Sequence, residues 1–119
     1  MRPDPVENHP VGTMDLLNIF TPLIRILGDR GYGHSVHFHE SIDAEGNPIP
    51  WITYPAMDYL RGLDFRRQRL FEFGAGHSTL FWAQRFREVT SVEHDGDWHA
   101  KISALAPPNC RVSALGCSH

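Results

Sequence analysis

The chain has 119 residues, of which 41% are hydrophobic and 11% aromatic, and its formal net charge is −3. These values fit one globular domain with a modest core, and the acidic balance makes nucleic acid an unlikely partner. The sequence has no run of eighteen apolar residues, and Met1 to Pro5 contain no apolar signal core. We therefore expect a cytoplasmic protein that does not span a membrane.

Residues 1–50 are predicted to form a tail, a helical segment and a loop. A proline-rich start predicts a loose tail over residues 1–12, and Thr13 can cap a helix. Apolar residues then recur at helical spacing, at Leu16, Phe20, Leu23 and Leu27. Because proline removes a hydrogen bond and clashes with the preceding turn, Pro22 predicts a kink or two short helices, the second capped by Thr21. Glycines are expected to end this helical region, at Gly28, Gly31 and Gly33.

The polar stretch that follows holds His34, His37 and His39 beside Glu40. No helical spacing links all three histidines, and on a strand His34 would point away from the other two, so we predict a polar loop or edge and no metal site. Two cysteines, Cys110 and Cys117, are too few for a disulfide framework or a closed zinc site, and reduced thiols are expected.

Residues 51–119 are predicted to alternate between helix and strand. Pro55 suits the first turn of a helix, and the buried run 70–73 reads as a strand that enters a glycine turn. A helix, a second strand at 89–93, a helix at 98–105 and a short third strand near 110–115 follow. This alternation predicts parallel crossover units, and therefore an α/β, Rossmann-like parallel sheet of about three strands with flanking helices.

The glycine turn and the acid at the end of the second strand predict a cofactor-binding site. Gly74 lets the chain turn sharply, Gly76 lets backbone approach a ligand, and Glu93 at the end of the second strand can accept hydrogen bonds from two ribose hydroxyls. A dinucleotide fingerprint would place glycine where Thr79 stands, and Glu72 would repel a phosphate. S-adenosylmethionine has no phosphate and carries two positive charges, so the residues favour the methyl donor.

The segment from Glu72 to Gly76 resembles the first motif of class I S-adenosylmethionine-dependent methyltransferases, and 91–95 resembles their second. The run 50–56 also resembles a segment that precedes the first strand in a group of uncharacterised bacterial members. The resemblance covers roughly residues 48–105. It implies that Gly74, Ala75 and Gly76 lie under the methionine part of the cofactor.

The same resemblance implies roles for the residues around the turn. Glu72 would hold the turn and the cofactor's amino group, Ser78 and Thr79 would open the following helix, Glu93 would bind the ribose, and His94 would pack on adenine. Trp51, Thr53 and Tyr54 would line the pocket near the methyl group, with core packing as the alternative for these aromatics. His77, His94 and Tyr54 are candidate bases, but no catalytic residue is assigned because none has a partner at diagnostic spacing.

Class I methyltransferases have a larger sheet, so the resemblance implies the N-terminal half of an enzyme domain. The methyl acceptor stays open, with a small molecule favoured. A homo-oligomer that pairs open sheet edges is a further expectation. Two other interpretations stay open: a truncated, non-enzymatic remnant or interaction module, and a fragment of an NAD-dependent oxidoreductase.

Overall fold

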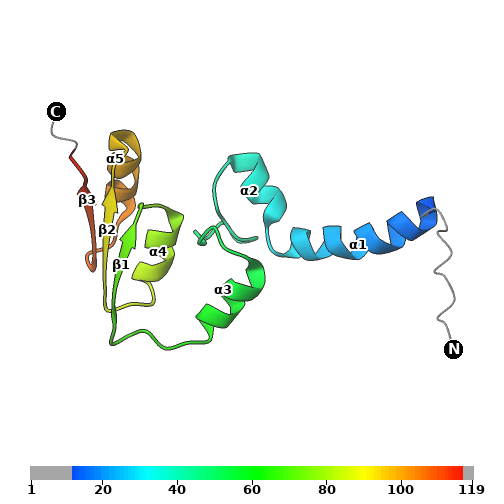
Figure 1. Cartoon of the computed structure of the whole chain (residues 1–119), viewed down its shortest axis with the longest axis horizontal. Helices are drawn as coiled ribbons and strands as arrows, with labels where there is room; N and C mark the ends of the chain where they lie inside the picture. The colour runs from blue at the N-terminus through cyan, green and yellow to red at the C-terminus, as the bar shows by residue number, and fades with distance from the viewer. Residues whose placement is uncertain (1–11, 117–119) are drawn as a thin grey trace, which may run out of the picture.

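The computed structural model describes residues 12–116, which form an α/β structure with an all-parallel, three-stranded sheet in the order β1-β2-β3. The strands are β1 (Arg69–Phe73), β2 (Glu88–Glu93) and β3 (Cys110–Ala114). Helices α4 (His77–Ala83) and α5 (Gly96–Leu105) connect them. The predicted fold class, an incomplete Rossmann-like sheet behind an N-terminal helical segment, is confirmed (Figure 1).

Three helices precede the sheet: α1 (Thr13–Asp29), α2 (Tyr32–Phe38) and α3 (Tyr54–Arg61). Figure 1 shows α1 projecting away from the rest of the molecule, and the longest dimension is accordingly 65 Å against 34 and 31 Å for the other two. No residue of α1 is buried. The predicted division at residue 50 falls between α2 and α3 and stays a prediction.

The helical boundaries near the N-terminus differ from those expected. The alternative of two short helices was wrong, because α1 continues through Pro22, and its N-cap is Gly12 rather than Thr13. Gly28 lies inside α1, and α2 occupies the stretch expected to be a polar loop or edge. Gly31 does separate the two helices: its φ is +82°, and an added Cβ would lie 2.3 Å from the Ala44 nitrogen. The predictions for the tail up to residue 11 and for Cys117 lie outside the described residues.

The two faces of the sheet have different surroundings. Residues Val89, Ser91 and Glu93 of β2 are buried on the face that α4 and α5 cover (Figure 1). Alternation along β1 places Phe71 and Phe73 on the opposite face, where they are 56% and 84% exposed. Among the described residues, β1 also pairs on one side only, so the sheet has an open edge beside an uncovered apolar face.

A small core joins α3 and α4. Met57 of α3 and Phe81 of α4 pack with Ile49, and Tyr54 and Trp82 lie against this cluster. Thr53 caps α3 by accepting a hydrogen bond from the Ala56 N–H at 3.4 Å. This packing fixes the segment before α3 next to the helix that follows the glycine turn.

Candidate functional site

The glycine turn between β1 and α4 uses its own backbone donors internally. Gly74 has a φ of +83°, and its N–H donates to the Val92 carbonyl at 2.8 Å. The Ala75 N–H donates to the Glu93 carboxylate at 2.9 Å, and the Gly76 N–H donates to the Thr79 hydroxyl at 2.9 Å. None of these three N–H groups therefore points free toward a ligand.

Glu72 lies under the turn, between the sheet and α4. Its carboxylate accepts hydrogen bonds from the hydroxyls of Ser91 at 2.7 Å, Ser78 at 3.2 Å and Thr79. Thr79 and Ser91 are fully buried, whereas Glu72 and Ser78 are half-buried. Glu72 thus ties β1, β2 and α4 together, which fits its expected role in holding the turn. Sequence reasoning missed Ser91, although it is the residue that pairs with Glu72 across the two strands.

Glu93 connects the end of β2 to the same turn. One carboxylate oxygen accepts from the N–H groups of His94 and Asp95, each at 2.9 Å, and the other accepts from Ala75. These donors, the Asp95 N–H most strongly, hold the pKa of Glu93 below its ordinary value against the opposing effect of burial. With three donors on a side chain that is 5% exposed, Glu93 has little capacity left for ribose hydroxyls in this arrangement.

Trp98 rather than His94 lies over the turn. The His94 side chain is 82% exposed and its Nδ1 atom is 3.1 Å from Glu93. The Trp98 indole N–H donates to the Ala75 carbonyl, and its ring is the nearest neighbour of a Cβ built on Gly76, at 3.8 Å. The Trp98 backbone N–H donates to the Asp95 side chain at 2.8 Å, which caps the start of α5. A capping acid followed three residues later by an aromatic residue is the sequence pattern that could have predicted Trp98 at this position.

A cavity of about 240 Å³ opens above the turn. Its wall combines the turn and the start of α4 with Trp98 and with a loop from before α3; it is lined by His39, Glu40, Ser41, Ile49, Trp51, Ala75, Gly76, His77, Ser78 and Trp98. The loop is held over the turn because the His77 ring shares a hydrogen bond with the Ser41 carbonyl at 2.8 Å. Lys101 donates to Glu40 at 2.8 Å and lowers the pKa of that carboxyl.

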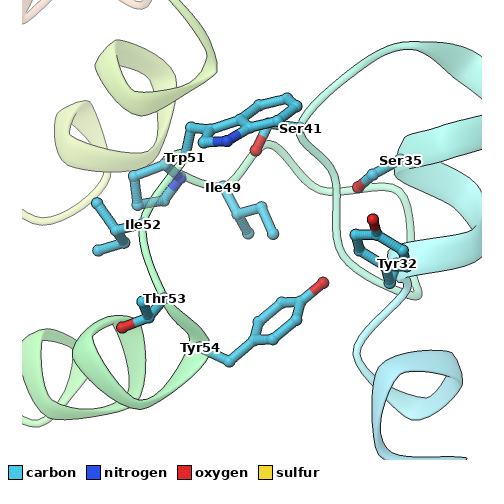
Figure 2. Close-up of a pocket in the computed structure, with 9 residues that line it drawn as sticks. Tyr32, Ser35, Ser41, Ile49, Trp51, Ile52, Thr53 and Tyr54 are labelled. Carbon is cyan, nitrogen blue, oxygen red and sulfur yellow. The ribbon is translucent and has the colours of Figure 1, made fainter. Parts of the chain in front are cut away.

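A second cavity, of about 290 Å³, adjoins the first. It is lined by Tyr32, Ser35, Ser41, Ile49, Pro50, Trp51, Ile52, Thr53 and Tyr54. Ser41, Ile49 and Trp51 line both cavities. Figure 2 shows the Tyr32 and Tyr54 rings on two sides of the space, with the Tyr54 hydroxyl directed into it and the Tyr32 hydroxyl at its edge, toward Ser35. Trp51 is 87% exposed, so core packing does not explain its position.

The structure brings most of the predicted site residues together. Ala75, Gly76 and Ser78 line the first cavity, Glu72 and Thr79 lie beneath the turn, and Glu93 holds it from β2. His94 points outward. Of the three candidate bases, His77 lines the first cavity and Tyr54 the second. Glu40 is a cavity residue that the sequence reasoning placed only beside a polar loop.

Residues 12–116 lack two other classes of feature. These residues contain no cluster of three or more His, Cys, Asp or Glu side chains placed to hold a metal ion, and His34, His37 and His39 form none. None of the helices in this part of the chain combines the length and the hydropathy needed to cross a bilayer. Cys110 is a free thiol whose pKa is raised by burial and by the nearby Glu72 carboxylate.

No protein-family model, no curated protein and no solved structure matches this chain.

Proposed function

We propose that this chain binds S-adenosylmethionine in the cavity above the glycine turn, as the cofactor-binding half of a methyltransferase-like protein. The observation that carries the proposal is the combination of a cavity on a strand-turn-helix unit with a turn whose three N–H groups are all used internally. Such a turn offers close backbone approach without offering its own three N–H groups to a phosphate. S-adenosylmethionine needs close backbone approach, and because it has no phosphate it does not need free N–H groups from the turn.

The same observation weighs against a dinucleotide. Dinucleotide sites cradle the pyrophosphate with free backbone N–H groups at the start of the helix. In the turn that leads to this helix, Gly74, Ala75 and Gly76 donate to protein groups, and the carboxylate of Glu40 lines the cavity. A phosphate would therefore find none of these three N–H groups free, and the Glu40 carboxylate, which pairs with Lys101 at 2.8 Å, would offer it no donor.

The volume of the first cavity suits one end of the cofactor. At about 240 Å³ it lies slightly below the roughly 300–1,000 Å³ typical of ligand pockets, so it accommodates the methionine end over Ala75 and Gly76. The Glu40 carboxylate, which already pairs with Lys101, lines this cavity and would accept a further hydrogen bond from the ammonium group, while Glu72 and Glu93 hold the turn in place. When bound, the cofactor would supply an activated methyl group: an acceptor's lone pair forms a bond to the methyl carbon while the carbon–sulfur bond breaks and its electron pair stays on sulfur. The protein's main task is then alignment and exclusion of water.

Calorimetric titration of S-adenosylhomocysteine into the 119-residue chain tests the proposal. Gly76→Val is the informative variant, because Gly76 has an extended φ of −174° and a Cβ there meets only Trp98 at van der Waals distance. The valine should fold and fill the cavity floor, so we expect at least tenfold weaker binding. Gly28→Val is the matched control, since a Cβ at Gly28 on α1 meets nothing within 4 Å. NAD, titrated in parallel, should give no saturable signal.

The open sheet edge supports a second candidate function, self-association. β1 has an unpaired side among the described residues, and Phe71 and Phe73 stand exposed on the adjoining face. Unpaired backbone beside apolar side chains is a template for pairing with another strand. We propose a homo-oligomer through this edge, which size-exclusion chromatography with light scattering would test; a monomer at all accessible concentrations would count against it.

A further inference from the structure

The cavity beside the proposed cofactor site has walls that define a ligand class. Nine residues line it, and none of them carries a charged side chain. Three are aromatic: Tyr32 from α2, Trp51 from the preceding loop and Tyr54 from the first position of α3. A charged ligand buried here would lose hydration without gaining a partner of opposite charge.

Some polar groups of this cavity already form hydrogen bonds within the protein, and others are available to a ligand. The Ser35 hydroxyl donates to the Ile42 carbonyl at 2.8 Å and accepts from its N–H at 3.2 Å, and the Thr53 hydroxyl caps α3. The phenol hydroxyl of Tyr54 instead points into the open space, and that of Tyr32 lies at the edge of the space on the side of Ser35 (Figure 2). Each can donate and accept, so together they can bind a ligand hydroxyl from two sides.

The surroundings of Tyr54 also disfavour a cationic ligand. The Arg30 guanidinium lies 5.7 Å from the centre of the Tyr54 ring and forms a hydrogen bond of 2.6 Å with Asp58. A guanidinium that is paired with Asp58 therefore already lies over one face of the Tyr54 ring, which leaves that face closed to a second cation. Burial of the phenol raises the pKa of Tyr54, which keeps that hydroxyl neutral and able to donate at physiological pH.

We propose that this cavity is the acceptor pocket and that it takes a small, uncharged phenol-type ring, whose hydroxyl is held by Tyr32 and Tyr54 while Trp51 covers the ring. The proposal rests on the proposed function, because an acceptor must lie next to the cofactor. Ser41, Ile49 and Trp51 line both cavities, so a ligand in one lies beside a ligand in the other. The aromatic walls can pack against the face or edge of a flat aromatic ring.

Three probes that share one phenol ring test the charge requirement. We would titrate 4-methylphenol, 4-hydroxybenzoate and tyramine into the chain saturated with S-adenosylhomocysteine, following ligand signals by NMR. The neutral probe should bind, and the anionic and cationic probes should bind several-fold more weakly. Methyl β-glucoside, a neutral sugar, should not bind. Stronger binding of either charged probe or of the sugar would overturn the assigned ligand class.

Two conservative variants test the hydroxyl contacts. Tyr32→Phe and Tyr54→Phe each remove one hydrogen-bonding group, so each should weaken 4-methylphenol binding by roughly three- to tenfold. Tyr59→Phe is the control, because Tyr59 lies on α3, is 70% exposed and does not line the cavity. Unchanged binding in both variants would overturn the assignment.

Separate titrations distinguish failure of this inference from failure of the proposed function. Neither Tyr32 nor Tyr54 lines the cavity above the glycine turn, so S-adenosylhomocysteine should bind both variants with unchanged affinity. If S-adenosylhomocysteine binds and no phenol does, only the acceptor pocket is refuted. If S-adenosylhomocysteine does not bind the folded chain, the proposed function and the acceptor role both fall.

Discussion

Replacing Glu93 by glutamine tests whether this carboxylate holds the glycine turn. The side chain is 5% exposed and accepts hydrogen bonds from the N–H groups of Ala75, His94 and Asp95, each at 2.9 Å. A glutamine can keep two of these on its carbonyl oxygen, without the charge, and turns an N–H toward the third donor. Because hydrogen bonds to charged groups contribute about 1.5–3 kcal/mol, we expect a loss of about 2–4 kcal/mol in the free energy of unfolding.

Urea unfolding followed by circular dichroism measures this loss. Glu88→Gln is the matched control, because Glu88 lies on the same strand with a half-exposed side chain, 3.5 Å from Arg69. Exposed ion pairs contribute little, so the control should lie within about 1 kcal/mol of the wild type. A Glu93→Gln variant as stable as Glu88→Gln would refute the reasoning that Glu93 fixes the turn.

The pH dependence of the free energy of unfolding, compared between the wild type and Glu93→Gln, gives an independent check. The folded chain holds the pKa of Glu93 below its ordinary value of 4.5, so the unfolded chain binds the proton more readily. Protonation therefore favours unfolding: the stability that Glu93 contributes is fully present above pH 4.5 and is lost as the pH falls through the lowered value of the folded state. The difference between wild type and Glu93→Gln should shrink over that range. A difference that grows on acidification would contradict the assigned direction.

Three further predictions address the turn, the sheet face and the thiol. Gly74→Ala should lower the free energy of unfolding by about 1–2 kcal/mol, since the φ of +83° is unfavourable for alanine, whereas Gly33→Ala inside α2 should be neutral or stabilising; thermal melts would show whether the two differ. Phe73→Lys should shift any oligomer toward monomer in light scattering without lowering the melting temperature, because this side chain is 84% exposed. Cys110 should react with iodoacetamide more slowly than free cysteine at pH 8, because burial raises its pKa; equal rates would contradict this.

The sheet half of the fold could be predicted because each element has a local signal. A buried run at 70–73, a glycine turn and a second strand at 89–93 are consistent with one another, and the structure has β1, α4 and β2 at those places. The capping signal at Pro55 likewise predicted the start of α3. Strand and helix alternation then left parallel pairing as the only economical arrangement.

The N-terminal helices were harder to predict because their local signals conflict. Pro22 disfavours a continuous helix, yet it removes a single backbone hydrogen bond while the rest of α1 stays paired. α2 contains Gly33 and two histidines, and because no helical spacing links the histidines of this stretch, the sequence suggested a loop or edge. In the structure, Ser35 of this helix instead forms two hydrogen bonds with Ile42, a contact that the local pattern does not encode.

The position of the candidate site in the chain could be predicted from the sequence, but the contacts between its residues could not. The glycine spacing located the turn, whereas the partners of its carboxylates depend on how distant segments meet. Ser91 reaches Glu72 only through the register of β1 and β2. Glu40 enters the cavity wall through a loop held by Lys101, which lies 61 positions later in the chain. Contacts of that kind are set by tertiary packing, which is why Glu40 and Trp98 were missed.

Calorimetric titration of S-adenosylhomocysteine into the wild-type chain, Gly76→Val and Gly28→Val tests the central claim most directly. The account predicts saturable binding to the wild type and to Gly28→Val, and binding at least tenfold weaker to a folded Gly76→Val. No binding to a wild-type chain that circular dichroism shows to be folded, or equal binding to all three proteins, would contradict a cofactor site above the glycine turn.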